Sequence, residues 1–417
     1  MREMKDSGVP WIGEIPIDWK LLRNKNAFLC SKEIVGNKSA TTRLLSLTTK
    51  GIKEKGPDVV GGKVPESFDT YQTVRKGQLV MCLFDLDCSA VFSGLSPLDG
   101  MISPAYKVVD CKEGMNTSFA SYWFSSVFDG RKFMHYSKNL RYTLTYDEFA
   151  VLPIVIPPLC EQQSIAKYLD SKCTEIDSIL ENTRASIEEY KKLKQSVITE
   201  AVTKGIRGER PMKDSGVEWI GEIPADWDVM KIKWLLKERN DRSEEGYEEP
   251  LSMSQKFGII PTKDMDVVPN MASSFVGAKL VYRGDLVFNK LKAHLGVFAV
   301  SEYEGLVSPD YAVYYSAGRC DVKYLERIFK TPQYISEFRK RSTGVGAGLT
   351  RLYTSDLFDM YTALPSETEQ QEIAAYLDEK CTAIDSLIVS KEALIAELEA
   401  YKKSIIYEYV TGKKEVK

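Results

Sequence analysis

The residues that most often carry enzyme chemistry are scarce in this chain. Its 417 residues contain two histidines, His135 and His294, which stand far apart. A histidine metal site or a supported Ser–His–Asp triad needs more partners than these two can supply. No GxxxxGK[ST] phosphate loop is present, and the glycine-rich stretch GVGAG (344–348) follows the basic run RKRST rather than a strand. The sequence therefore indicates no catalytic centre.

Two short motifs could be read as catalytic, and each occurs twice. SPAY (103–106) and SPDY (308–311) are similar to the [DNS]PP[YFW] motif of adenine amino-methyltransferases, but both lack the second proline. LDSK (169–172) and LDEK (377–380) contain a nuclease-like D-x-K pattern, but they lie within stretches of helical periodicity. We interpret the first pair as turns that lead into strands and the second as surface charge.

Composition limits the class of protein. The net charge is −3, so the total gives no argument for nucleic acid or for an anionic membrane. The eight cysteines form no CxxC pair, which favours free thiols in a reducing compartment. No apolar run approaches the ~18–20 residues that span a bilayer, and the first residues do not resemble a signal peptide. We expect a cytoplasmic protein that does not contact a membrane.

Local clusters of basic residues are more informative than the total charge. They lie beside glycines or aromatic residues in HYSKNLRYT (135–143), FNKLKAHLG (288–296) and EFRKRSTGVGAGLTRLY (337–353). Lys, Arg and Asn can hold phosphates and can also read base edges in a major groove. Solvated surface charge is the alternative explanation for any single cluster. The candidate DNA-binding residues are Lys138, Asn139, Arg141, Lys290, Lys292, Arg339, Arg341 and Arg351.

The chain repeats itself after half its length. MKDSGVPWIGEIPIDW (4–19) returns as MKDSGVEWIGEIPADW (212–227), and EQQSIAKYLDSKCTEIDSI (161–179) returns as EQQEIAAYLDEKCTAIDSL (369–387). Both pairs have the same offset, and the text between them differs. Tandem duplication of one unit, made of a constant phrase, a variable globule and a constant tail, explains this pattern.

Both constant tails are predicted to be long helices. Apolar or small residues recur from Ile165 to Ala201, and again from Ile373 to Tyr409, at the helical period of 3.6. Prolines stand just before each tail, and Ser366 with Glu369 matches a capping box. A long helix with one apolar stripe needs a partner, so we expect the two helices to pack antiparallel as a coiled-coil pair. The alternative is that each helix packs only on its own globule.

The predicted fold is α+β. Two homologous α/β globules are separated by the two long antiparallel helices, and the duplication makes the molecule pseudo-twofold. The predicted parts are a first domain at 1–156 that includes the constant phrase, a central helix at 157–205, a second domain at 206–364 and a C-terminal helix at 365–417.

The duplicated phrases resemble one known family. MKDSGV-x-WIGEIP-x-DW, followed by a variable region, a proline-rich turn and EQQ-x-IA-x-YLD-x-K-x-x-x-ID, is similar to the specificity subunit of type I restriction–modification systems. The resemblance covers the whole chain. It implies that the variable globules are target recognition domains, each reading one half of a bipartite site in double-stranded DNA, and that the helices set the spacer.

The resemblance also implies partners. Two methyltransferase subunits are expected to dock on the helices, and restriction subunits with motor and nuclease activity are expected to join the complex. This subunit would need no cofactor, because S-adenosylmethionine and ATP would belong to the partner subunits. The alternatives are a stand-alone adenine-specific DNA methyltransferase, which would need a cofactor motif that the sequence lacks, and a protein-interaction scaffold without a role on DNA.

Overall fold

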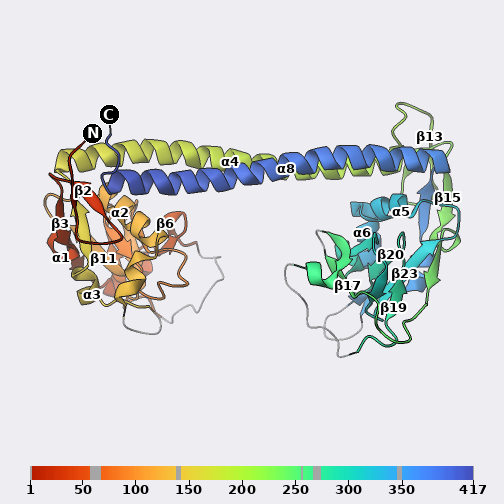
Figure 1. The fold of residues 1–417 in the computed structure, drawn as a ribbon, viewed down its shortest axis with the longest axis horizontal. Helices are drawn as coiled ribbons and strands as arrows, with labels where there is room; N and C mark the ends of the chain where they lie inside the picture. The colour runs from red at the N-terminus through yellow and green to blue at the C-terminus, as the bar shows by residue number, and fades with distance from the viewer. Residues whose placement is uncertain are drawn as a thin grey trace. The chain divides into compact units, whose positions relative to one another are not determined.

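The chain divides into two compact units in the computed structural model. Unit 1 is Met1–Arg184 with Glu392–Lys417, and unit 2 is Ala185–Lys391. The structure describes residues 2–56, 67–137, 142–254, 257–265, 274–344 and 350–416. Two long helices, α4 (Leu159–Lys204, 46 residues) and α8 (Glu367–Val410, 44 residues), each contribute one part to each unit (Figure 1).

The globule of unit 1 is built mainly from short antiparallel strands. The strands are β1 (Met4–Asp6), β2 (Glu14–Pro16), β3 (Lys20–Arg23), β4 (Phe28–Ser31), β5 (Leu45–Thr48), β6 (Gly51–Glu54), β7 (Gln72–Val74), β8 (Leu79–Met81), β9 (Ser93–Leu95), β10 (Gly100–Ile102), β11 (Lys107–Cys111) and β12 (Pro153–Ile156). The helices before α4 are α1 (Asn24–Ala27), η1 (Gly36–Thr41), α2 (Thr117–Asp129), η2 (Lys132–Tyr136) and α3 (Tyr146–Ala150).

Unit 2 repeats this order of strands, with the additional pair β24 and β25 before the last strand. Its strands are β13 (Met212–Asp214), β14 (Glu222–Pro224), β15 (Asp228–Lys231), β16 (Leu236–Arg239), β17 (Leu251–Ser254), β18 (Gly258–Pro261), β19 (Lys279–Val281), β20 (Leu286–Asn289), β21 (Phe298–Val300), β22 (Gly305–Val307), β23 (Tyr311–Ser316), β24 (Thr343–Gly344), β25 (Thr350–Arg351) and β26 (Tyr361–Leu364). Its helices before α8 are η3 (Ile232–Trp234), η4 (Thr262–Asp264), η5 (Ala293–Leu295), α5 (Val322–Phe329), α6 (Pro332–Arg341) and α7 (Thr354–Phe358).

The sheets of the two units have the same topology. The largest sheet has the order β4-β11-β8-β9 in unit 1 and β16-β23-β20-β21 in unit 2, and all of its neighbours are antiparallel. The smaller pairs β10-β7 and β12-β3 correspond to β22-β19 and β15-β26. The diverged text between the constant phrases therefore folds twice into one scaffold.

Both faces of the central sheet are buried. In β8, Leu79 and Met81 belong to the main core of unit 1, whereas Val80 belongs to a smaller cluster on the opposite face. In β20, Leu286 and Phe288 face the main core of unit 2, and Val287 faces a second small cluster. This division follows from the alternation of side chains along a strand.

Each main core includes the start of one long helix and the end of the other. In unit 1, Ile165 and Leu169 of α4 pack in the same cluster as Ile406 and Val410 of α8. In unit 2, Val202 of α4 and Ile373 and Leu377 of α8 join the core. Each helix therefore packs on one globule at its start and on the other at its end, and not only on its own globule as the alternative explanation proposed.

Ion pairs join the two helices within each unit. In unit 1, Lys402 donates to Asp177 and Arg184 donates to Glu399, both at 2.6 Å. In unit 2, Lys194 Nζ lies 2.6 Å from Asp385 Oδ2. Residue numbers rise along one helix as they fall along the other, so the packing is antiparallel (Figure 1). The predicted α+β fold with long antiparallel helices is confirmed.

Candidate nucleic-acid interface

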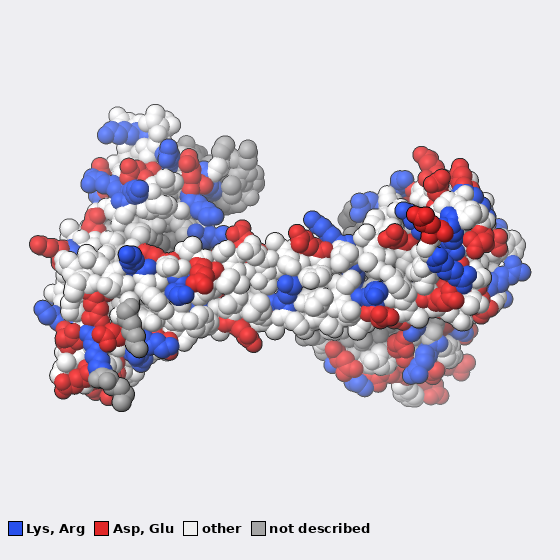
Figure 2. All heavy atoms as spheres, turned by 90° about the horizontal axis from the view of Figure 1, so that it is seen from above, with Lys and Arg blue, Asp and Glu red and all other residues white. Residues whose placement is uncertain are grey.

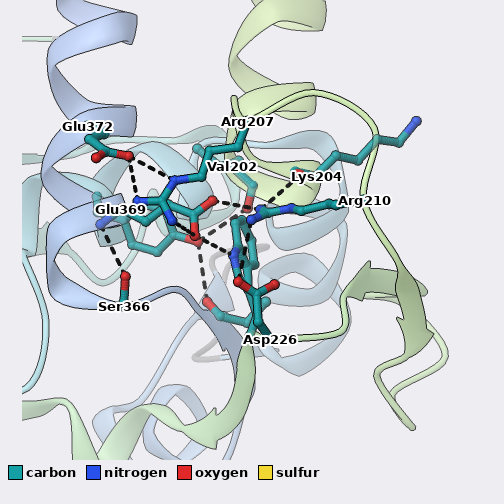
Figure 3. A network of polar contacts seen from close by, with 11 residues as sticks. Val202, Lys204, Arg207, Arg210, Asp226, Ser366, Glu369 and Glu372 are labelled. Atoms are coloured by element: carbon teal, nitrogen blue, oxygen red, sulfur yellow. Dashed lines mark hydrogen bonds and ion pairs between the residues drawn. The ribbon is translucent and has the colours of Figure 1, made fainter.

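A buried carboxylate fastens α8 to the constant phrase of unit 2. Glu369 is 1% exposed, and its carboxylate accepts hydrogen bonds from Arg210 Nη2 at 2.7 Å and Trp227 Nε1 at 3.1 Å (Figure 3). The Arg210 guanidinium also lies over the Trp227 ring, 5.2 Å from its centroid. We call this set, Glu369 with Arg210 and Trp227, the junction of unit 2.

Unit 1 contains the same junction at equivalent positions. Glu161 accepts hydrogen bonds from both terminal nitrogens of Arg2 and, at 2.9 Å, from Trp19 Nε1. The hydrogen bond to Glu161 is the main reason why the pKa of Arg2 is raised above its ordinary value. The repeated Trp and Glu of the constant text therefore have a structural role in each unit.

Of the two hydrogen bonds of the predicted capping box at the start of α8, the one accepted by the Ser366 side chain is present. Ser366 Oγ accepts a hydrogen bond from the backbone N–H of Glu369 at 3.3 Å, as the motif requires. The carboxylate of Glu369 makes the junction contacts to Arg210 and Trp227. A buried partner with positive charge competes better for this carboxylate than a backbone N–H does.

The glutamine after each junction carboxylate ties the long helix to its globule. Gln162 Oε1 accepts from the backbone N–H of Asn116 at 2.7 Å, just before α2. Gln370 Oε1 accepts from the backbone N–H of Asp321 at 2.8 Å, just before α5. The EQ dipeptide of the repeated EQQ text thus fixes the globule relative to the helix in both units.

The basic segments of unit 2 come together in space. Lys290 and Lys292 follow β20, next to η5, and Arg351 lies in β25. The backbone N–H of Leu352 donates to the carbonyl of Lys290 at 3.0 Å, so the two segments touch. Arg339 and Arg341 lie in the last turn of α6, and α6 packs against η5. All five of these candidates therefore surround one part of the globule.

These five cationic side chains differ in whether a carboxylate of the protein already pairs with them. Arg351 Nη2 lies 3.1 Å from Asp310, and Arg341 Nε lies 3.5 Å from Glu337. Lys292 and Arg339 are exposed and have no salt-bridge partner among the residues that the structure describes. Exposed, unpaired cations are the best placed to contact phosphates.

Lys290 lies in a cationic environment. Its pKa is lowered, first because burial penalises the charged ammonium and then because Lys279 and Arg351 lie close by. Glu238 and Asp310 oppose this effect in part. An anion or an electron-rich base edge would relieve the repulsion among these side chains.

The outer face shown in Figure 2 has no large patch of either sign. Lys and Arg are interspersed with Asp and Glu over the helices and both globules. Among the described residues, no group of three or more His, Cys, Asp or Glu could hold a metal ion, and no helix there is long and apolar enough to cross a membrane.

Two curated proteins from Methanocaldococcus jannaschii are similar to this chain. The type I restriction enzyme MjaVIII specificity subunit is 26% identical over 282 residues, and the match covers 64% of this chain and 64% of that protein. The putative type I restriction enzyme MjaX specificity subunit is 28% identical over 275 residues, with 64% and 60% covered. The chain thus matches less than two thirds of the length of either relative. No protein-family model matches it.

Solved structures support the same relationship at the level of the fold. One is described as showing complex assembly and conformational transition of the type I R-M system; it has a TM-score of 0.71 at 15% identity and covers 96% of this chain and 99% of its own. The HsdS subunit from Thermoanaerobacter tengcongensis has a TM-score of 0.54 at 15% identity, with 98% and 100% covered. The resemblance to type I restriction specificity subunits is confirmed.

Three of the predicted DNA-binding residues lie outside the described residues. They are Lys138, Asn139 and Arg141 of the first globule. The prediction about them stays a prediction, as does the one about the five candidates of unit 2.

Sequence reasoning missed Lys279 in the neighbourhood of these candidates. Its side chain is 4% exposed, and its Nζ lies 3.2 Å from Glu238. It stands in the short apolar strand β19, where a single lysine is easily taken for an exposed side chain. A lysine at the inward-facing position of a strand is the signal that could have identified it.

Proposed function

We propose that this chain is the DNA-recognition subunit of a type I restriction–modification complex and carries no catalytic centre of its own. Each globule reads one half of a bipartite site in double-stranded DNA. The observation that carries the proposal is one scaffold built twice, with the same sheet order and the same junction, around diverged text. A repeated scaffold with unlike surface residues suits two similar readings of different sequences.

The proposed parts keep the predicted limits. Residues 1–156 and 206–364 are the recognition domains, and 157–205 and 365–417 are the helical segments, which set the spacer between the half-sites. The compact units cut across both helices because each globule packs on one helix start and one helix end. The helical segments therefore serve both recognition domains.

Two methyltransferase subunits are the proposed partners of the helices. Equivalent apolar side chains are exposed on them twice: Ile179 (41%) with Leu387 (46%), and Leu193 (49%) with Tyr401 (52%). In unit 1, Ile179 and Tyr401 lie at one level of the helix pair, because Asp177 pairs with Lys402 there. In unit 2, Leu193 and Leu387 lie at one level, because Lys194 pairs with Asp385. The same partner surface is thus offered once in each unit.

Restriction subunits and the cofactors belong to the same proposal. S-adenosylmethionine and ATP are bound by the partner subunits, and this chain needs neither. The relatives are named specificity subunits, so they favour neither a stand-alone adenine methyltransferase nor a scaffold without a role on DNA.

A gel-shift experiment tests the proposal. The chain is mixed with duplexes of random sequence, alone and together with co-expressed methyltransferase subunits, at two salt concentrations. We expect the complex to select duplexes with two short fixed sequences separated by a spacer. Complexes that bind without any sequence selection would contradict a recognition role, and methylation by the isolated chain would show an enzyme.

A further inference from the structure

One place in the scaffold carries unlike chemistry in the two units. In unit 1 the backbone N–H of Leu144 donates to the carbonyl of Leu83 at 2.7 Å. In unit 2 the backbone N–H of Leu352 donates to the carbonyl of Lys290 at 3.0 Å. These two hydrogen bonds make Leu83 equivalent to Lys290, at the turn that follows β8 or β20. We call the surroundings of this turn the strand-end site.

Strand pairing identifies a second equivalent position in the strand-end site. Gln72 of β7 pairs with Ile102, and Lys279 of β19 pairs with Val307, at the same step of equivalent ladders. Thr143 corresponds to Arg351, because Thr143 directly precedes Leu144 and Arg351 directly precedes the equivalent Leu352. Position 105 corresponds to 310 within SPAY and SPDY. The strand-end site is thus Gln72, Leu83, Ala105 and Thr143 in unit 1, and Lys279, Lys290, Asp310 and Arg351 in unit 2.

The strand-end site of unit 2 is rich in hydrogen-bond donors. Lys279, Lys290 and Arg351 face the carboxylates of Glu238 and Asp310, so cations are in excess. The Arg351 side chain is 25% exposed and is held by Asp310 through Nη2. Its Nε is buried and has no hydrogen-bond partner among the described residues. This arginine is positioned by Asp310 and is one quarter exposed.

The strand-end site of unit 1 has no charged member. Gln72 Nε2 donates to the carbonyls of Ser103 at 3.1 Å and Tyr106 at 2.7 Å, so it is fully used in holding the SPAY turn. Phe84, next to Leu83, packs on the Tyr106 ring at 5.6 Å between centroids. Apolar groups and a threonine replace the cations of unit 2.

Backbone strain marks the strand-end site of unit 1. Asp85 and Tyr142 have backbone φ angles of 50° and 45°, values that residues other than glycine rarely adopt. The backbone N–H of Asp85 donates to Thr143 Oγ1 at 3.4 Å, and that of Leu86 donates to the Tyr142 carbonyl at 3.2 Å. Strain of this kind persists where surrounding contacts enforce it, and it gathers at functional sites.

We propose that the strand-end site of each unit contacts a base edge in the DNA, and that Lys290 and Arg351 of unit 2 contact a guanine. This inference rests on the proposed function and names residues that set its specificity. Guanine offers two acceptors, O6 and N7, in the major groove, and Arg or Lys is their usual partner. In unit 1 neutral and apolar groups occupy the same place, so a different base is read there.

A base contact suits Lys290 and Arg351 better than a phosphate contact. A phosphate attracts any nearby cation, and exposed chains such as Lys292 and Arg339 can meet it. Arg351 is largely buried and is oriented by a carboxylate, and Lys290 is half-buried beside it. Side chains held in place are what reading of a base edge requires.

The test measures the sequence preference of the assembled complex on a library of duplexes. Arg351→Ala and Lys290→Ala should each reduce the preference for guanine at one position of one half-site by about 5- to 150-fold. The other half-site should be unchanged, which also shows that the variant is folded. Lys237→Ala, which removes an exposed lysine of β16, is the control and should change neither half-site.

A second variant separates charge from geometry. Arg351→Lys keeps the positive charge but loses the planar fork, so it should reduce the guanine preference by less than Arg351→Ala does, while overall affinity is kept. Equal weakening of all sequences, with a smaller salt dependence, would show a phosphate contact and overturn the inference. Changes in both half-sites would also overturn it. A wild-type complex without any half-site preference would instead overturn the proposed function itself.

Discussion

Glu369 explains why the constant phrase and the constant helix occur together in each unit, because its side chain joins the two. It is buried at the start of α8, with Arg210 at 13% exposure and Trp227 as its partners. Substitution by alanine leaves the indole N–H of Trp227 without this acceptor and removes the closest carboxylate of Arg210. Among the described residues, Arg210 then keeps only the more distant Asp226 at 3.6 Å and the Lys204 carbonyl. Loss of one partner of a buried charge pair is far more costly than loss of an exposed one, because the remaining charge is desolvated and unpaired.

The first prediction follows from this contrast. Glu369→Ala should lower the free energy of unfolding of unit 2 by about 3 kcal/mol. Glu372→Ala, whose carboxylate is 44% exposed and pairs with the exposed Arg207, should lower it by less than ~1 kcal/mol. Urea unfolding of the two variants is the measurement, and similar losses in both would contradict the assigned role of the junction.

A second prediction concerns Lys290 and pH. Its lowered pKa means that the folded protein holds this proton less tightly than the unfolded chain, so the charged lysine costs stability at neutral pH. That cost is relieved as the pH rises from the lowered pKa toward the ordinary value of 10.5. Under the proposed guanine contact, DNA binding needs the charged ammonium of Lys290. The affinity should therefore start to decrease, as the pH is raised, at a pH lower than 10.5.

The neighbours that face Lys290 are Lys279, Glu238, Arg351 and Asp310. The two cations, Lys279 and Arg351, lower the pKa of Lys290 further, and the two carboxylates raise it. Lys290→Arg, which stays protonated, should remove the decline in affinity. Binding measured at constant salt from ~pH 7 to ~pH 10 checks this. Identical profiles for the two proteins would show that Lys290 does not titrate in that range.

The sequence predicted part of the candidate site. Clusters of Lys and Arg beside glycines pointed to Lys290 and Arg351, but only the fold shows that they meet. That meeting depends on a pairing between segments about sixty residues apart, and no local pattern encodes it. Lys279 was missed for the same reason, since a lone lysine becomes notable only when its neighbours are known.

At the scale of elements, the long helices were the most predictable feature. The apolar period of 3.6 and the prolines before each tail predicted helices whose observed limits are Leu159–Lys204 and Glu367–Val410. The apolar–aromatic run that begins near Ser118 forms α2, which ends at Asp129. Strand pairing could not be predicted, because β19 and β22 are three residues each and lie far apart in sequence.

The third prediction belongs to the helices. Ile179→Glu and Leu387→Glu place a charge at equivalent exposed positions, one in each unit. If these positions contact the methyltransferase subunits, each substitution should remove one subunit from the complex, and the double variant should remove both. Native mass spectrometry of the purified complex measures the stoichiometry.

A matched control is Glu181→Lys, because Glu181 is an exposed residue of α4 that is charged in the wild type. It should leave the stoichiometry unchanged. Retention of both subunits by the double variant would show that these apolar positions are not a docking surface, and the proposed role of the helices would then rest on other residues.

At the scale of the whole molecule, the two copies of the duplicated unit share their scaffold and differ in the residues of the strand-end site. The sheet order, the junction and the glutamine after it are the same in both units. The strand-end sites differ in charge, with Lys290 and Arg351 in one unit and Leu83 and Thr143 in the other. Shared parts suit a partner that is present twice, and unlike parts suit two different half-sites.

The measurement that tests this division most directly is methylation mapping of a chimaera. Residues 228–364, between the second constant phrase and the second long helix, are exchanged for the variable region of a type I restriction specificity subunit, and the methylated sites of the resulting complex are determined. We expect one half-site to change, with the other half-site and the spacer kept. A change in both half-sites, or in neither, would contradict the claim that each globule reads its own half of the DNA site.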